Sequence, residues 1–323
     1  MLQHPPVEWR PTASLDVLRL RAALLAQIRA FFAGRSILEV ETPILSSAGA
    51  CDPNLHSLTI CLSISPGVFY LHTSPEFPMK RLLAAGSGPI YQIVRVFRDG
   101  ERGRLHNPEF TLIEWYRPGS NHHTLMDEVE ELLSLTLGTG RCDRFSYEEV
   151  FERYAGWDPH SADAEMLKGY AQRLGLRFSE TSEGEPNYYL DLILSHCIAP
   201  HLGVARPAFI YDFPASQAAL ARIRQGTCPV AERFELFING MEIANGFHEL
   251  TDPVEQRQRF EAEQLRRKTL GLPVVPMDER LLAALAYGLP QSAGVALGFD
   301  RLVMVRTGAI DIAEVLGFPI EWA

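Results

Sequence analysis

The sequence predicts an α+β fold in which helices flank an antiparallel sheet. Most strand candidates follow one another with helices inserted at irregular intervals, whereas a Rossmann fold alternates strand and helix strictly. The patterns GxGxxG and GxxxxGK[ST], which bind phosphates in parallel α/β folds, are absent from the chain. In addition, Asn239 and Gly240 stand between two apolar runs, which is the signature of a type I′ hairpin.

The composition is that of an ordinary globular protein. The 323 residues are 46% hydrophobic and 22% charged, which excludes a disordered chain, a collagen-like repeat and a small disulfide scaffold. At roughly 150 residues per domain, this length fits two domains or one large one. The net charge of −10 argues against a free-standing nucleic-acid binder that neutralises many phosphates.

Cysteine use and the N-terminus bear on the location of the protein. The five cysteines are odd in number and no two are spaced as CxxC, which fits a reducing cytosol and gives no zinc site. Residues 1–15 contain two early prolines and no apolar core of a signal peptide. No run of about 18 apolar residues is present. We therefore expect a cytoplasmic protein.

The elements of the first half follow from capping residues and apolar patterning. After an irregular arm at residues 1–13, Ser14 is expected to cap a helix over residues 15–33, which Gly34 ends. The other elements predicted up to residue 138 are strands at 37–40, 68–72, 90–97 and 110–117, a loop at 46–57, and helices at 78–85 and 124–138.

The second half begins with a region of variable helical pattern at residues 146–180. A polar loop at 181–187 separates it from a helix at 188–199. The elements predicted beyond these are a strand at 209–213, the hairpin strands at 234–238 and 241–247, helices at 254–269 and 278–287, and a strand at 295–299 that leads into a helix from about residue 300.

The hairpin predicts a pair of neighbouring carboxylates. If Asn239 and Gly240 form the turn, Glu242 pairs with Phe237 and Glu235 lies opposite Ala244, so both glutamates project from one face. Two such carboxylates repel each other unless a cation lies between them or one is protonated, and oxygen ligands of this kind suit Mg²⁺. From the hairpin alone, a solvated face on which two glutamates meet is the more common arrangement.

Two further segments carry residues suited to phosphate binding. Residues 97–110 (FRDGERGRLHNPEF) place Arg98 at the end of a strand and two more arginines in a polar loop, which suits a polyphosphate, with Phe110 available to stack on a base. Residues 294–302 (GVALGFDRL) feed a glycine-bearing strand into a helix whose first turn carries Arg301. Taken singly, a solvated loop and a well-packed junction are the more common explanations of these patterns.

Together these segments resemble motifs 2 and 3 of class II aminoacyl-tRNA synthetases. Residues 40–43 (VETP) after the first long helix resemble motif 1, the dimer-interface element, so the resemblance implies a homodimer. The match is to the lysyl branch and covers nearly all of residues 14–318. The segments that support this branch are residues 73–76 (TSPE), 106–111 (HNPEFT), 114–116 (EWY) and 245–250 (NGFHEL).

The chain departs from a lysyl-tRNA synthetase at its start. Such synthetases carry an N-terminal OB-fold, on the order of 100 residues or more, that reads the anticodon, whereas about a dozen residues precede the first helix here. We expect residues 14–323 to form a catalytic domain with a variable helical insertion at about 146–200. The chain resembles the stand-alone paralogues that activate (R)-β-lysine with ATP and join it to the ε-amine of a lysine on elongation factor P.

The resemblance implies roles for residues in the nucleotide site. Arg98 holds the α-phosphate and the incoming carboxylate, and Arg301 holds the γ-phosphate. Phe110 and Arg301 enclose the adenine, and Asn107 with nearby backbone reads its edge. Mg²⁺ is held by Glu235 and Glu242, which agrees with the hairpin geometry. The other residues expected at ATP are Asp99, Gly100, His106, Ile243 and Gly298.

The amino-acid substrate is a dication with one carboxylate, so its site must be acidic. By resemblance, Glu249 with Tyr116 takes the ε-ammonium, and Glu76 and Glu114 lie near the other amine. The remaining substrate-binding residues implied are Ser74, Pro75, Asn245, Phe247 and Ala296. Structural roles stay open, with Tyr116 as a core aromatic residue and Asn245 as a turn residue.

Three departures from lysyl-tRNA synthetases refine the interpretation. Ser74 and Ala296 stand where these synthetases usually have Ala and Gly, and the added methyl at Ala296 is expected to crowd an α-amine more than a β-amine. Motif 2 normally reads Phe-Arg-x-Glu, but Gly100 stands at the last position. Either Glu101 replaces that glutamate through a loop shift, or adenine recognition is weaker.

Two other functions remain open at this stage. The chain could be a truncated synthetase that charges tRNA or another acceptor with α-lysine, although its acidic charge weighs against tRNA. It could also be a synthetase-like regulatory protein without turnover, which only Gly100 supports. The sequence identifies no base for the acceptor amine.

Overall fold

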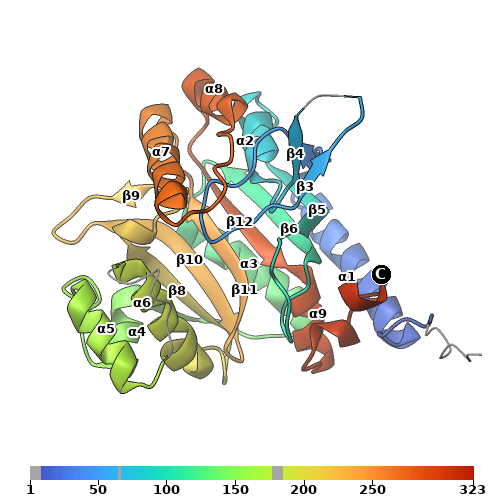
Figure 1. The fold of residues 1–323 in the computed structure, drawn as a ribbon. Coiled ribbons are helices and arrows are strands. Elements are labelled where there is room, and N and C mark those ends of the chain that lie inside the picture. Colours follow the sequence, from blue (N-terminus) through green and yellow to red (C-terminus); the bar gives the residue numbers. More distant parts are fainter. Residues whose placement is uncertain (1–8, 65–66, 177–184) are drawn as a thin grey trace, which may run out of the picture.

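The computed structural model describes residues 9–64, 67–176 and 185–323, and its centre is one large sheet (Figure 1). In these residues nine strands form that sheet, with β9 (Ile223–Arg224) paired beside β10. The order of the other strands is β1 (Leu38–Glu39), β5 (Ile90–Phe97), β6 (Glu109–Pro118), β12 (Ser292–Gly298), β11 (Met241–His248), β10 (Val230–Ile238), β8 (Ala208–Pro214) and β7 (Asp143–Ser146). A second, three-stranded sheet contains β2 (Leu45–Ser46), β4 (Val68–Leu71) and β3 (Thr59–Cys61).

The predicted α+β class is confirmed. The neighbours from β5 to β8 are all antiparallel, and only the outer pairs β1–β5 and β7–β8 are parallel. The sheet is therefore not a doubly wound one, as the absence of strict strand–helix alternation indicated. In the described part of the chain, no helix combines the length and apolar character needed to cross a membrane.

One face of the sheet is covered by α1 (Leu15–Ala33), α3 (His122–Leu137) and α9 (Phe299–Thr307). The strands turn alternate residues toward these helices, so Ala293, Val295 and Leu297 of β12 join the main core. The helix starts are well capped, since Ser14 accepts a hydrogen bond from the Val17 amide and Asn121 forms a capping box with Thr124. The intervening residues of each central strand face the opposite side.

The opposite face carries two separate groups of helices (Figure 1). The helices α2 (Glu76–Ala84), α7 (Pro253–Thr269) and α8 (Glu279–Gly288) pack together above β5 and β6 through a core that includes Met79, Phe260 and Leu281. The helices α4 (Tyr147–Ala155), α5 (Ala164–Arg173) and α6 (Pro186–Ile193) pack against β8 and β10. The central strands β6, β12 and β11 lie between these two groups.

Most predicted elements are present, with shifted ends. The predicted strand at 37–40 shortens to β1, and the predicted helix at 78–85 begins two residues earlier in α2. The predicted helix at 188–199 is wrong in its second half, because α6 changes into a π-helix at Leu194–Ile198 and then a 3₁₀ turn. The loop at 181–187 lies largely outside the described residues. The short strands β2, β3, β7 and β9 were not expected, and β2 includes Ser46 of the predicted loop at 46–57.

The hairpin has the predicted turn but a different register. Asn239 and Gly240 both have positive φ, at 51° and 76°, as a type I′ turn requires. Phe237 pairs with Glu242 as expected, but a β-bulge follows, and Glu235 pairs with Asn245 rather than Ala244. The bulge shifts the pairing by one residue, while Glu242 still lies opposite Phe237 and shares the face of Glu235.

Candidate active site

A cavity of about 830 Å³ opens on the face of the sheet between the two groups of helices. Its lining comes from β6, β10, β11, β12, the start of α2, one side of α7, the start of α9 and the segment at residues 43–57. The site residues expected from the sequence that line it are Ser74, Glu76, Arg98, His106, Asn107, Phe110, Glu114, Tyr116, Glu235, Glu242, Ile243, Asn245, Phe247, Glu249, Ala296, Gly298 and Arg301. The structure therefore brings segments from most of the chain into one cavity.

Strand pairing places many of these side chains in two rows across the cavity floor. The first row runs through four paired strands and consists of Glu114, Ala296, Asn245 and Glu235. The second row, two residues along each strand, consists of Tyr116, Gly294, Phe247 and Arg233. Because residues two apart share a face, both rows face the cavity, and Ala296 lies between a carboxylate and an amide as a floor residue should.

Three carboxylates gather at one end of the cavity. Glu114 is buried, and its two oxygens accept hydrogen bonds from the Ser74 hydroxyl at 2.8 Å and the Tyr116 hydroxyl at 2.7 Å. Glu249 is 1% exposed and Glu76 is partly buried. Gly294 makes this packing possible, because a Cβ there would lie 2.2 Å from Tyr116 Cε1 and 2.6 Å from Glu249 Oε1.

The carboxylates at this end have unusual pKa values. Burial, reinforced by the charge of Glu76, raises the pKa of Glu114 to about 7. Burial also raises the pKa of Glu249, and the carboxylates of Glu76 and Glu114 add to the shift while Lys80 opposes it. A cation that enters the cavity would therefore stabilise the ionised form of each of these carboxylates.

Lys80, which the sequence analysis did not single out, lies among these carboxylates. Its ammonium is 2.6 Å from an oxygen of Glu76 and 2.6 Å from an oxygen of Glu249, and its side chain is 2% exposed. The i, i+4 spacing of Glu76 and Lys80 on one helix was a visible signal for the first pair. The second pair depends on tertiary packing.

Arginines occupy the other end of the cavity. The Arg98 guanidinium lies 5.0 Å from the centroid of the Phe110 ring and 3.4 Å from Glu101. Arg301 donates to the Glu242 carbonyl at 2.8 Å and lies 2.9 Å from His106 Nε2. Burial and the charge of Arg301 lower the pKa of His106. The cavity thus has an acidic end and a basic end.

Not every predicted site residue lines the cavity. Asp99 and Gly100, predicted at ATP, and Pro75, predicted at the amino acid, are outside its lining, whereas Glu101 is part of it. Asn107 lines the cavity, and its side-chain amide donates to the Glu109 carbonyl at 2.6 Å while its oxygen accepts from the Ile320 amide at 3.0 Å. Asn107 thereby ties this loop to the C-terminal segment, and its amide keeps one further N–H hydrogen.

Glu235 and Glu242 form a donor pair that fits a hard cation. Both line the cavity, and burial raises the pKa of Glu235, with the charge of Glu242 adding to the shift and Arg233 opposing it. Arg233 was missed by the sequence analysis, although it stands two residues before Glu235 on the same strand face. It donates to Glu235 at 2.5 Å and to the Asn245 side-chain oxygen at 3.2 Å.

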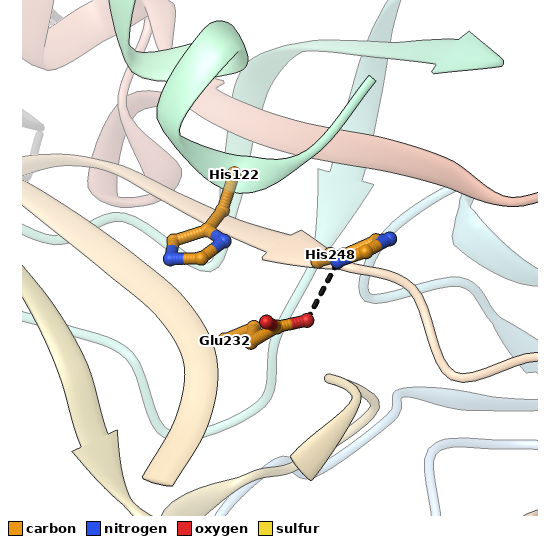
Figure 2. Close-up of side chains that lie close together, drawn as sticks. All are labelled: His122, Glu232 and His248. Atoms are coloured by element: carbon orange, nitrogen blue, oxygen red, sulfur yellow. Dashed lines mark hydrogen bonds and ion pairs between the residues drawn. The ribbon is translucent and has the colours of Figure 1, made fainter. Parts of the chain in front are cut away.

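A second cluster of possible ligands lies outside the cavity lining. His122, Glu232 and His248 are the one group of three in the described residues whose ligand atoms lie within 4.8 Å of one another, and Figure 2 shows His248 hydrogen-bonded to Glu232 at 2.6 Å. Glu232 also lies 3.6 Å from Arg222 and 3.7 Å from Arg224. We interpret this cluster as a charge-balanced network that joins α3 to β10 and β11, because its carboxylate already has cationic partners.

Comparison with known proteins gives consistent matches over the whole chain. Residues 1–321 match the family described as tRNA synthetases class II (D, K and N). The chain is 50% identical to the elongation factor P–(R)-beta-lysine ligase of Vibrio cholerae serotype O1 over 321 residues, covering 98% of this chain and 99% of that protein. It is 48% identical to the protein of the same name from Edwardsiella ictaluri (98% of each chain) and 49% identical to that from Vibrio vulnificus (98% and 99%).

Proposed function

The chain belongs to the class II tRNA synthetase family, and we propose that it activates (R)-β-lysine with ATP and transfers it to the ε-amine of a lysine on elongation factor P. Relatives that are about half identical over nearly the full chain are named for this ligase activity. The observation that carries the proposal is the polarity of the cavity, whose acidic end suits two ammonium groups and whose basic end suits a triphosphate.

The first step joins the amino acid to ATP. The carboxylate attacks the α-phosphate and pyrophosphate leaves, so the protein must hold two anions together and neutralise the charge that develops. Arg98 lies beside the ring of Phe110 and donates to the Thr73 carbonyl at 3.3 Å, next to Ser74 of the acidic end. Arg301 lies beside Glu242 and His106. We assign Arg98 to the α-phosphate and carboxylate, and Arg301 to the outer phosphates.

Glu235 and Glu242 are the residues that would hold Mg²⁺, which would supply positive charge to the phosphates of ATP. Their carboxylates share a face, and the repulsion between them contributes to the raised pKa of Glu235. A cation between them removes this repulsion. Arg233, hydrogen-bonded to Glu235, keeps that carboxylate oriented toward the cavity face that it shares with Asn245.

The acidic end selects the amino acid. Glu249 and the Tyr116 hydroxyl are placed for one ammonium group, and Glu76 and Glu114 for the other. Ser74 donates its hydroxyl hydrogen to Glu114 and accepts the Glu76 amide at 3.1 Å, so it fixes the position of this wall. In the second step the acceptor amine attacks the carboxyl carbon of the adenylate, and the bond to AMP breaks.

We further propose a homodimer that works in the cytoplasm, where the acceptor takes part in translation. The surface around the motif 1 region supports the dimer, because it exposes apolar side chains on β1, β3 and β4 and just before β2. These are Leu38, Ile44, Ile60 and Val68, which are 40–56% exposed. Exposed apolar groups of this density favour a protein interface. Light scattering after gel filtration would measure the mass of the particle.

The direct test is acceptor labelling. The protein is incubated with ATP, (R)-β-lysine and either elongation factor P or tRNA, and the products are analysed by mass spectrometry. The proposal predicts one β-lysyl group on a single lysine of the factor. Arg301→Ala should abolish the product, whereas Arg306→Ala, on the exposed last turn of the same helix, should retain it. Labelling of tRNA alone, or of neither acceptor, would contradict the proposal.

A further inference from the structure

Lys80 is the buried cation of the acidic end, and its geometry constrains both carboxylates that it touches. One ammonium bridges Glu76 on its own helix and Glu249 just beyond β11, at 2.6 Å to each. Each of the two carboxylates therefore uses one of its oxygens to contact Lys80. In the described residues, the second oxygen of each has no hydrogen-bond donor, and both residues line the cavity. Lys80 therefore leaves one oxygen of each carboxylate for a ligand.

The number of charges at this end is informative. Three carboxylates, those of Glu76, Glu114 and Glu249, surround one lysine ammonium. When all are ionised, the group carries two net negative charges, which matches the two ammonium groups of a diamino acid. Without the lysine the group would carry three, and buried like charges that lack a partner take up protons instead of binding a cation.

The choice of lysine at this position is also specific. Lysine occurs at only three positions in the chain, 80, 168 and 268, among 30 basic residues. A compact ammonium can contact two carboxylates from one point, whereas the planar guanidinium of arginine needs more room and a different geometry. Lys80 is enclosed by residues that leave it 2% exposed. Its two partners also raise its pKa, so it stays protonated and does not compete as a nucleophile near an activated acyl group.

We propose that Lys80 is a positioning residue that favours the ionised forms of Glu76 and Glu249 and limits the charge of the fully ionised acidic end to minus two, so that the site requires a substrate with two ammonium groups. This inference rests on the proposed function and assigns the selection of diamino acids to a residue that does not itself contact the substrate. Its effect is exerted through the two carboxylates.

The test measures amino-acid-dependent ATP–pyrophosphate exchange between pH 6 and 9. Lys80→Met should raise KM for (R)-β-lysine by at least about tenfold, because the unpaired carboxylates become protonated, and leave KM for ATP nearly unchanged. The rising limb of kcat/KM against pH should move to higher pH. Lys80→Gln keeps hydrogen bonding without charge and should behave like Lys80→Met. Lys268→Met, the same change on the exposed end of α7, should match the wild-type protein.

The variants separate a charge effect from a structural one. A wild-type KM and pH profile in Lys80→Gln would overturn the proposal, as would a parallel loss of ATP binding in each folded variant. If Lys80→Met does not fold, Lys80→Gln and Lys80→Arg decide. The arginine variant keeps the positive charge and should keep the wild-type pH limb, although its larger side chain raises KM for the amino acid. If the wild-type protein activates a different diamino acid, the assignment of (R)-β-lysine is wrong. The role of Lys80 is then tested by comparing KM and the pH profile of the same variants with that amino acid.

Discussion

At the scale of single residues, the amino-acid site depends on the absence of large side chains on the cavity face of β12. Gly294 faces the cavity between Tyr116 and Phe247, and its lack of a side chain gives room to the Tyr116 ring and to Glu249. Two residues on, Ala296 carries one methyl group between Glu114 and Asn245. The side chains of this strand therefore set the depth of the floor beneath the substrate.

Gly294→Ala is expected to damage amino-acid binding. The added Cβ would lie 2.2 Å from Tyr116 Cε1, which real atoms do not tolerate, so the ring and Glu249 must move. Overpacking of this kind costs roughly 1–3 kcal/mol, and kcat/KM for the amino acid should fall by about tenfold or more. Pyrophosphate exchange and urea unfolding measure both effects. Gly140→Ala, which meets no atom within 4 Å, is the control; equal behaviour of the two variants would contradict the account.

Ala296→Gly is expected to improve the use of α-lysine relative to (R)-β-lysine. Removing the methyl group deepens the floor beside Glu114, where the amine of the substrate must fit. A single methyl or methylene group in such a site changes discrimination by roughly tenfold or more. The ratio of kcat/KM for the two amino acids in pyrophosphate exchange measures the change, and an unchanged ratio would refute this role.

At the scale of elements, the β10–β11 hairpin connects turn chemistry to metal and phosphate binding. The type I′ turn at Asn239 and Gly240 fixes the pairing of Phe237 with Glu242. The bulge then gives Glu235 the partner Asn245. Because both glutamates share a face, the turn determines whether the two carboxylates reach the same ligand.

Gly240→Ala is expected to destabilise this hairpin. Gly240 has φ of 76°, and a Cβ there would lie 3.2 Å from the Ala199 carbonyl oxygen. The left-handed conformation alone costs a non-glycine residue about 1–2 kcal/mol, so the urea midpoint should fall by a corresponding amount. Asn239→Gly, at φ of 51°, is the matched control and should change stability by less than about 1 kcal/mol. A larger loss in the control would be inconsistent with the turn assignment.

The sequence predicts the turn and most strands because these depend on local patterns. The apolar alternation of β5, β6 and β10 and the Asn-Gly pair needed no knowledge of distant contacts. The bulge between Leu236 and Phe237 was not predicted, since the apolar alternation around the turn carries no mark of it. The short strand β7 has a polar sequence and is defined only by its pairing with β8.

The same distinction applies to the site. Motif residues such as Arg98, Arg301 and Glu242 could be placed by resemblance. The hydrogen bond between Asn107 and Ile320 could not, because it joins the motif to a distant C-terminal segment. The contact of Lys80 with Glu249 also joins segments far apart in the chain, and a helical i, i+4 pair gives no hint of a second partner.

At the scale of the whole molecule, one cavity contains an acidic end and a basic end. Its buried carboxyl groups make the stability of the protein sensitive to pH. The pKa values of Glu114, Glu235 and Glu249 are raised mainly by burial. The folded state therefore keeps protons that the unfolded state releases above the usual carboxylate pKa near 4.5. By linkage, the contribution of these three carboxyl groups to the stability of the substrate-free protein falls as pH rises from about 4.5 toward 8.

Binding of a dicationic substrate should oppose this loss. The ligand favours ionised Glu114 and Glu249, so its stabilisation of the protein should be greater at pH 8 than at pH 6, until its own amines lose their protons. Thermal unfolding with and without (R)-β-lysine at the two pH values measures the difference. Glu114→Gln should reduce the pH dependence. Equal or greater stabilisation at pH 6 would show that these carboxylates do not bind the ammonium groups.

The measurement that tests the central claim most directly is ATP–pyrophosphate exchange with α-lysine, (R)-β-lysine and (S)-β-lysine in parallel. The account predicts the strongest exchange with (R)-β-lysine, because the acidic end of the cavity fits two ammonium groups above a floor raised by Ala296. It also predicts that Gly100 does not prevent turnover, since Glu101 lines the cavity in its place. Exchange with α-lysine alone, or with none of the three, would contradict the account.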